Sequence, residues 1–129
     1  MNSYTFQAYG HKNIRATHRT TLEFTKEEDV TLTGDCIIGV CATFELQHLK
    51  PFLTKEKIKI IIRTDGMEEE IIAVPNLGFM SDKEMVIRTT GFQSERTFAV
   101  YATKSAVGLR KDFKSLLCRP ETVVTVTIT

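Results

Sequence analysis

Short runs of alternating apolar and polar residues, rich in threonine, valine and isoleucine, recur along most of this chain. Successive side chains of a β-strand point to opposite faces, so a period of two predicts strands that bury one face. The segment Thr122–Ile128, which reads T-V-V-T-V-T-I, shows the pattern well. We expect eight strands, at Tyr4–Tyr9, Thr20–Thr25, Cys36–Thr43, Lys57–Arg63, Glu69–Val74, Glu84–Thr89, Arg96–Thr103 and Thr122–Ile128.

Two segments depart from this alternation and are expected to be helical. In Lys104–Leu117 the apolar residues approximate the stripe of an amphipathic helix. The segment Phe44–Leu53 contains Pro51, which lacks an amide donor, so its helix should be short or end near Leu49. The fold class is therefore α+β, with a mixed β-sheet of about eight strands and two helices.

The order of these elements occurs twice. Residues 39–43 (G-V-C-A-T) resemble residues 99–103 (A-V-Y-A-T), and both segments precede an expected helix. We therefore expect a single domain, residues 1–129, with a duplicated strand-strand-strand-helix-strand unit at 4–64 and 69–129 and pseudo-two-fold symmetry. Each strand-helix-strand step should be a right-handed crossover that places its two strands in parallel.

Composition limits the classes of function. A chain of 129 residues with 42% hydrophobic content suits one globular domain, and a net charge of +1 gives no general attraction to nucleic acid or membrane. The first residues lack the charged and apolar regions of a secretory leader, so we expect none, and no apolar run is long enough to cross a membrane. Its three cysteines lack the spacing of a zinc site, so we expect reduced thiols and a cytoplasmic protein.

The most unusual stretch is the basic segment Gly10–Thr21, which reads G-H-K-N-I-R-A-T-H-R-T-T. It holds two histidines and three cations, and no acidic residue precedes Glu23. The corresponding connection of the second half, residues 75–83, has one acid, one base and no histidine. Joining two strands therefore does not require these basic residues, which makes the basic segment a candidate site.

Several runs resemble a known family. The runs A-T-H-R-T-T-L-E-F-T-K at 16–26 and G-D-C-I-I-G-V at 34–40 resemble the archaeal family catalogued as domain of unknown function 371. The segments M-V-I-R at 85–88 and R-T-F-A-V at 96–100 also resemble it, so the resemblance covers most of the chain. It implies an archaeal, cytosolic protein, and it implies no activity and no catalytic residue.

The residues themselves suggest chemistry within the basic segment. Imidazole titrates near neutral pH, so His11 and His18 are candidates for proton transfer, with Asp35 as an orienting carboxylate. The same three groups, or Cys36 in place of Asp35, are the best metal ligands available. Taken singly, each imidazole and Asp35 also fits a structural role in a loop, and Cys36 fits a core position. The expected binding residues are Asn13, Arg15, Arg19, Thr20 and Thr21.

Other charged residues offer weaker signals. Arg88 and Arg96 share the planar fork that makes arginine a good phosphate ligand, but they lack the acid-free setting of the basic segment. The run Glu68–Glu70 fits charge on an edge strand that deters further pairing. Aromatic residues make up 9% of the chain, without tryptophan, and form no obvious platform for stacking bases. A secondary anion or RNA face is expected along the second helix, at Lys104, Ser105, Arg110, Lys111 and Lys114.

These residues together favour the binding of a phosphorylated or other anionic small molecule, and they leave open whether the protein is an enzyme. Three alternatives stay open: an RNA-binding protein, a metal-dependent hydrolase using His11, His18 and Asp35, and a structural or partner-binding protein, including a homo-oligomer that buries the basic segment. We assign no cofactor, no metal site and no membrane partner.

Overall fold

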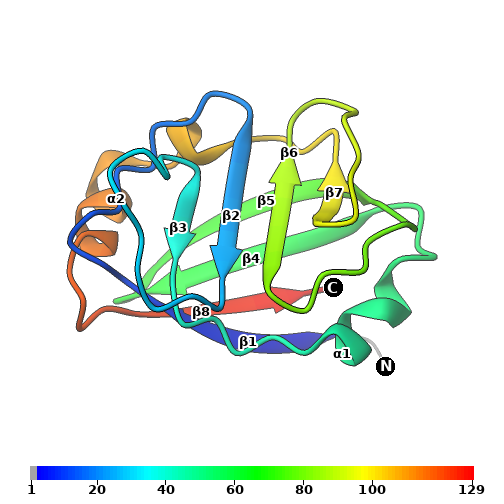
Figure 1. Ribbon diagram of the computed structural model, residues 1–129, viewed down its shortest axis with the longest axis horizontal. Helices are drawn as coiled ribbons and strands as arrows, with labels where there is room; N and C mark the ends of the chain where they lie inside the picture. Colours follow the sequence, from blue (N-terminus) through cyan, green and yellow to red (C-terminus); the bar gives the residue numbers. More distant parts are fainter. Residues whose placement is uncertain (1–2) are drawn as a thin grey trace.

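The computed structural model describes residues 3–129 and has the expected α+β class, with eight strands and two short helices in this range (Figure 1). The 3₁₀ turns η1 (Lys50–Phe52) and η2 (Ala106–Gly108) accompany the helices. The strands are β1 (Tyr4–Tyr9), β2 (Thr21–Thr25), β3 (Ile37–Gly39), β4 (Ile58–Thr64), β5 (Met67–Pro75), β6 (Glu84–Arg88), β7 (Thr97–Val100) and β8 (Val123–Ile128), and the helices are α1 (Leu46–Leu49) and α2 (Lys111–Leu117).

Both helices are shorter than the segments expected from the sequence, for different reasons. Helix α1 ends at Leu49, as expected, because Pro51 follows and the chain continues as the 3₁₀ turn η1. The second helical segment is divided into η2 and α2. The division falls at Arg110, whose amide nitrogen donates to the Glu69 carboxylate at 2.7 Å and whose backbone is extended (φ −63°, ψ 148°).

The strands form one mixed sheet in the order β1-β8-β4-β5-β7-β6-β2-β3. Parallel pairing occurs between β2 and β3 and between β6 and β7, while the other neighbours are antiparallel. The expectation that helix-linked strands pair in parallel is wrong, since β3 and β4, and likewise β7 and β8, are not neighbours. The parallel pairs are instead joined by the non-helical connections 26–36 and 89–96, which return outside the sheet.

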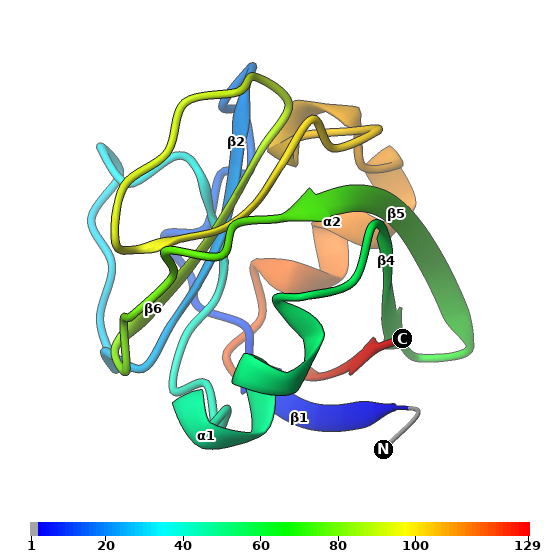
Figure 2. The same cartoon turned by 90° about the vertical axis from the view of Figure 1, so that its right-hand side faces the viewer.

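The sheet is strongly curved around the interior (Figure 2). Its edge strand β1 meets the chain just after β3, where Tyr9 and Val40 exchange two backbone hydrogen bonds of 2.8 Å. The hairpin between β4 and β5 has a two-residue turn, Asp65-Gly66, with φ values of +48° and +77°. Two positive φ values are required by the turn type that matches the twist of paired strands, which explains the Asp-Gly sequence.

The two halves of the chain share local geometry. Cys41 and Tyr101, just after β3 and β7, both have positive φ values, of +53° and +52°. Thr43 then bonds β1 through its amide (2.9 Å) and its hydroxyl oxygen (3.0 Å), and Thr103 bonds β5 in the same way (3.0 and 3.1 Å). These equivalences accompany the equivalent parallel pairs, while descent from a duplicated unit stays a prediction.

The core lies inside the curved sheet. Strand β2 contributes Leu22 and Phe24, both fully buried, and the Phe24 ring meets the edge of the Phe6 ring at a centroid distance of 5.6 Å. The opposite face of β2 is also covered, because Thr21, Glu23 and Thr25 are buried. Glu23 there contacts Cys36 of connection 26–36 and Arg96 of connection 89–96. A strand of five residues therefore buries both faces, one apolar and one polar. None of the helices within residues 3–129 has the length and apolar character needed to cross a bilayer.

Candidate functional site

The basic segment joins β1 to β2 and is packed against the body of the protein. Ile14 and Ala16 are 2% and 1% exposed and anchor its middle. Helix α2 holds the same stretch by its backbone, since Lys114 Nζ donates to the Ala16 carbonyl at 3.0 Å and Cys118 Sγ to the Ile14 carbonyl at 3.2 Å. The segment is thus a fixed feature of the fold, in which the buried Ile14 and Ala16 alternate with exposed Arg15 and Thr17.

At the N-terminal end of the basic segment, hydrogen bonds of His11 and Asn13 fix the conformation of the backbone. His11 Nδ1 accepts a hydrogen bond from the Asn13 amide at 3.0 Å, and its Nε2 lies 2.8 Å from Asp29 Oδ1. The Nδ1 atom is therefore unprotonated and the Nε2–H group donates to the carboxylate. Asn13 Nδ2 in turn donates to the Val30 carbonyl at 2.9 Å. Both nitrogens of His11 have partners within the protein.

At the other end, His18 organises the entry into β2. Its Nδ1 accepts hydrogen bonds from the amides of Thr20 (3.2 Å) and Thr21 (3.1 Å), which leaves Nε2 as the protonated nitrogen. The Thr20 carbonyl accepts from the Thr89 amide at 2.8 Å, and the Thr21 side chain is buried. This end of the segment therefore lies beside the end of β6 and the start of connection 89–96.

Asp35 contributes through its backbone, because its carbonyl accepts from the amides of Thr17 (3.0 Å) and His18 (3.2 Å). Among residues 3–129, no three histidine, cysteine, aspartate or glutamate side chains are grouped to hold a metal ion. A catalytic role for His11, His18 and Asp35 stays a prediction. The expectation that Cys36 packs in the core is wrong, since its thiol is half-buried and donates to Glu23 Oε1 at 3.5 Å.

The cations of the basic segment face outward. Lys12, Arg15 and Arg19 are exposed, and no carboxylate of the described residues lies within ion-pairing distance of them. Lys114 adds a fourth cation beside Ala16 and likewise makes no ion pair in this part of the chain. The uncompensated charge seen in the sequence therefore persists in the folded protein as a positive surface.

The secondary anion or RNA face expected along the second helix differs from the basic segment, because a carboxylate pairs with two of its cations. Glu69, 3% exposed, lies 2.7 Å from Lys104 Nζ and 3.7 Å from Arg110 Nε. Ser105 is also engaged, since its hydroxyl donates to the Arg19 carbonyl at 2.7 Å. Of the four cations expected on this face, Lys111 and Lys114 make no ion pair within residues 3–129.

The interpretation of Glu68–Glu70 as edge-strand charge is wrong, because β5 lies inside the sheet between β4 and β7. Each carboxylate instead has a cation partner. Glu69 is buried against Lys104 as described above, and Glu68 and Glu70 pair with Arg63 (2.9 Å) and Lys59 (3.8 Å) on the neighbouring strand β4. These three carboxylates are ion-paired with nearby cations, so they do not neutralise the positive charge of the basic segment.

A polar cluster around the buried Glu23, on the outer face of β2 and β6, was not predicted from the sequence. Glu23 is 5% exposed, and burial followed by the charge of Glu84 raises its pKa from 4.5 to about 7. Arg96 pairs closely with Glu84 and lies 3.9 Å from Glu23 Oε1. Burial and the Glu23 carboxylate together raise the pKa of the Cys36 thiol to about 12. The available signal was that Glu23 and Glu84 occupy polar positions of the expected strands Thr20–Thr25 and Glu84–Thr89.

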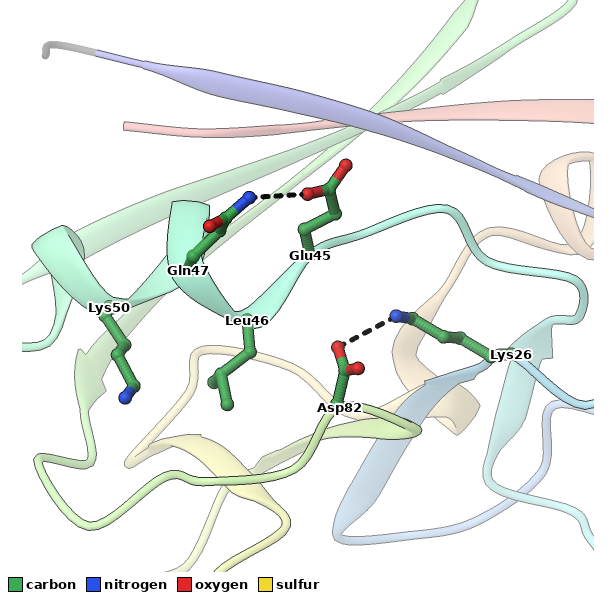
Figure 3. Close-up of a pocket in the computed structure, with 6 residues that line it drawn as sticks. All are labelled: Lys26, Glu45, Leu46, Gln47, Lys50 and Asp82. Carbon is green, nitrogen blue, oxygen red and sulfur yellow. Dashed lines mark hydrogen bonds and ion pairs between the residues drawn. The ribbon is translucent and has the colours of Figure 1, made fainter.

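A hollow of about 410 Å³ opens between α1 and the connection that leads into β6 (Figure 3). Its charges are largely paired: Lys26 Nζ lies 2.9 Å from Asp82 Oδ1, and Gln47 Nε2 donates to Glu45 Oε2 at 2.8 Å. The hydrogen bond and the charge of Lys26 lower the pKa of Asp82. None of the residues expected to form a site lines this hollow, whose walls are Lys26, Glu45, Leu46, Gln47, Lys50 and Asp82.

Comparison with known proteins gives a family without an assigned activity. Residues 6–129 match the family model described as "Domain of unknown function (DUF371)". An uncharacterised protein of the archaeon Methanocaldococcus jannaschii, MJ0206, is 34% identical over 116 residues, which cover 84% of this chain and 86% of that protein. The matches agree with the resemblance noted in the sequence and add no ligand.

Proposed function

Because the chain belongs to the DUF371 family, whose description names no activity, its function must be argued from its own residues, and we propose that it binds a phosphorylated or other anionic small molecule at the basic segment Gly10–Thr21. The observation that carries this proposal is the absence, within residues 3–129, of any ion pair to Lys12, Arg15 or Arg19. We place this activity in the cytoplasm.

The rigidity of the basic segment supports this proposal. A flexible loop would lose conformational entropy on binding, whereas Ile14 and Ala16 already hold the backbone in place. Guanidinium groups present paired donors that match phosphate and carboxylate oxygens, so Arg15 and Arg19 suit an anionic ligand. Lys12 and Lys114 add long-range attraction without fixing the geometry.

The alternatives have less support. RNA binding along the second helix would use Lys104 and Arg110, but both are ion-paired with Glu69, which lowers the net charge of this face. A metal-dependent hydrolase would need three grouped ligands, which the described residues do not provide. A purely structural role would not explain why the cations of the basic segment are exposed and unpaired. A homo-oligomer that buries this segment would have to remove these charges from water, which costs free energy.

Isothermal titration with inorganic pyrophosphate tests the proposal. Arg19→Gln and Arg15→Gln should each weaken binding by roughly ten- to a hundredfold, because one charge-assisted contact contributes about 1.5–3 kcal/mol. Lys59→Gln removes one positive charge from an exposed, ion-paired position of β4 and should leave the affinity unchanged. Equal weakening in all three variants would indicate a response to net charge, and the lack of saturable binding to wild-type protein would sink the proposal.

A further inference from the structure

Arg88 stands at the end of β6 without a counter-ion. Its Nε donates to the Thr97 hydroxyl oxygen at 3.0 Å, and no described residue accepts from its two terminal nitrogens. Within residues 3–129 no carboxylate lies in ion-pairing distance of it. Burial, and then the like charge of Arg96, lower the pKa of Arg88. A half-buried guanidinium beside a second one is a place where an anion would be stabilised.

Exposed aromatic rings lie beside this guanidinium. The Arg88 Cζ atom is 4.9 Å from the centroid of the Phe92 ring, and Phe92 is 62% exposed. Tyr101, 64% exposed, lies against Gly91, the residue before Phe92, so closely that a Cβ on Gly91 would clash with the Tyr101 hydroxyl oxygen. The Tyr101 amide also donates to the Thr90 carbonyl at 3.1 Å. Phe92 therefore lies over the unpaired Arg88 guanidinium, and the Tyr101 ring lies against Gly91, next to Phe92 in the sequence.

The backbone at Tyr101 is set by the fold. Its φ of +52° lies in the left-handed region, and Cys41 has a φ of +53° at the equivalent place after β3. The absence of a side chain at Gly91 makes room for the Tyr101 ring, so glycine and tyrosine depend on each other here.

The aromatic patch is continuous with the basic segment. The Thr89 amide donates to the Thr20 carbonyl at 2.8 Å, and Thr21 pairs with Arg88 in the register of β2 and β6. Figure 1 shows connection 89–96 leaving β6 at the same end of the sheet at which the basic segment enters β2. A ligand that spans both places would meet exposed cations on one side and exposed rings on the other.

We propose that Phe92, Tyr101 and Arg88 form a platform for a nucleobase, so that the anion bound by this protein is a nucleotide, either free or as a unit of single-stranded RNA. The proposal rests on the proposed function, because Arg88 and the basic segment would share the phosphate. Flat aromatic faces stack on any base, and the stacked cation favours an electron-rich ring. The sparse aromatic content of the chain is thus offset by the exposure of these two rings.

Titration calorimetry with AMP and ribose 5-phosphate separates this inference from the proposed function, because the two probes differ only in the base. Wild-type protein should bind AMP about tenfold more tightly. Phe92→Ala should abolish that preference and leave ribose 5-phosphate binding unchanged, and Phe92→Trp should restore the preference. Leu32→Ala, at another apolar position that is 56% exposed, is the matched control and should behave as wild type.

Each result of these titrations supports or overturns the base platform, the anion site or both. Equal affinity for AMP and ribose 5-phosphate would overturn the base platform and leave anion binding intact, whereas binding of neither would overturn both proposals. A base preference that persists in Phe92→Ala would also refute the platform. An oligoadenylate that binds at least tenfold more tightly than AMP, with a steep salt dependence, would identify single-stranded RNA as the source of the nucleotide, and equal affinities would identify the free nucleotide.

Discussion

Replacing Glu23 with glutamine is expected to stabilise the folded protein at about pH 8 and to change its stability little at about pH 4. Glu23 is buried beneath connections that cross the outer face of the sheet, and no cation pairs closely with it, because the nearest one, Arg96, is held by Glu84. Burial and the Glu84 charge raise its pKa from 4.5 to about 7, so the folded protein favours the neutral carboxyl.

The size and sign of the effect follow from proton binding in the two states. Below pH 4.5 the carboxyl is protonated in both folded and unfolded protein and adds no penalty. Between 4.5 and about 7 the unfolded chain loses this proton first, so the free energy of unfolding falls as the pH rises. Above about 7 the penalty is constant. The difference between the two pKa values corresponds to about 3 kcal/mol, and Glu23→Gln removes it.

Urea denaturation followed by circular dichroism over this pH range measures the effect. The free energies of wild type and Glu23→Gln should agree at low pH and diverge towards about 3 kcal/mol at about pH 8. Glu70→Gln is the matched control: its side chain is 46% exposed and paired with Lys59, so it should change stability by less than about 1 kcal/mol. A difference between Glu23→Gln and wild type that is independent of pH would refute the reasoning.

Three further outcomes follow from the packing and the backbone. Cys36, whose pKa is raised to about 12, should resist iodoacetamide at pH 8 while the exposed Cys118 is alkylated, and mass spectrometry that found both modified equally fast would contradict this. Ile14→Ala, at a position 2% exposed, should lower the free energy of unfolding by about 2–5 kcal/mol, whereas a loss near zero would show that the basic segment is not anchored. Gly66→Ala, at φ +77°, should cost about 1–2 kcal/mol in the same assay, and unchanged stability would argue against the positive φ of that turn.

Much of the fold could be predicted from periodicity, because the alternation of apolar and polar residues within a segment is enough to identify that segment as a strand. Strand β1 has the bounds expected for it, and Pro51 correctly ended the first helix. Pairing was harder, because alternation carries no information about which strands become neighbours. The crossover rule failed for β3 and β4 because it applies to strands that are adjacent in the sheet, and these two are not.

The burial of Glu23 could not be predicted from the local pattern, because Glu23 occupies a polar position of β2 that ordinarily faces solvent. Glu69 differs, since it shares the face of Ile71 and Ala73, which is the buried face of β5. Each is buried by a segment distant in sequence, Glu23 by the outer connections and Glu69 by Lys104 and the start of α2. The exposed cations of the basic segment were easier to predict, since a lack of nearby acids is visible in the sequence itself.

Titration of isotopically labelled protein with pyrophosphate, followed by ¹⁵N–¹H NMR, tests the central claim most directly, because it shows where the anion binds. Saturable shifts should concentrate at the amides of Arg15, Thr17 and Arg19 and at the residues of α2 that contact them, and they should disappear in a variant with both Arg15→Gln and Arg19→Gln. Shifts that centre instead on Lys26 and Lys50 around the hollow beside α1, or the absence of saturable shifts, would contradict an anion site at the basic segment.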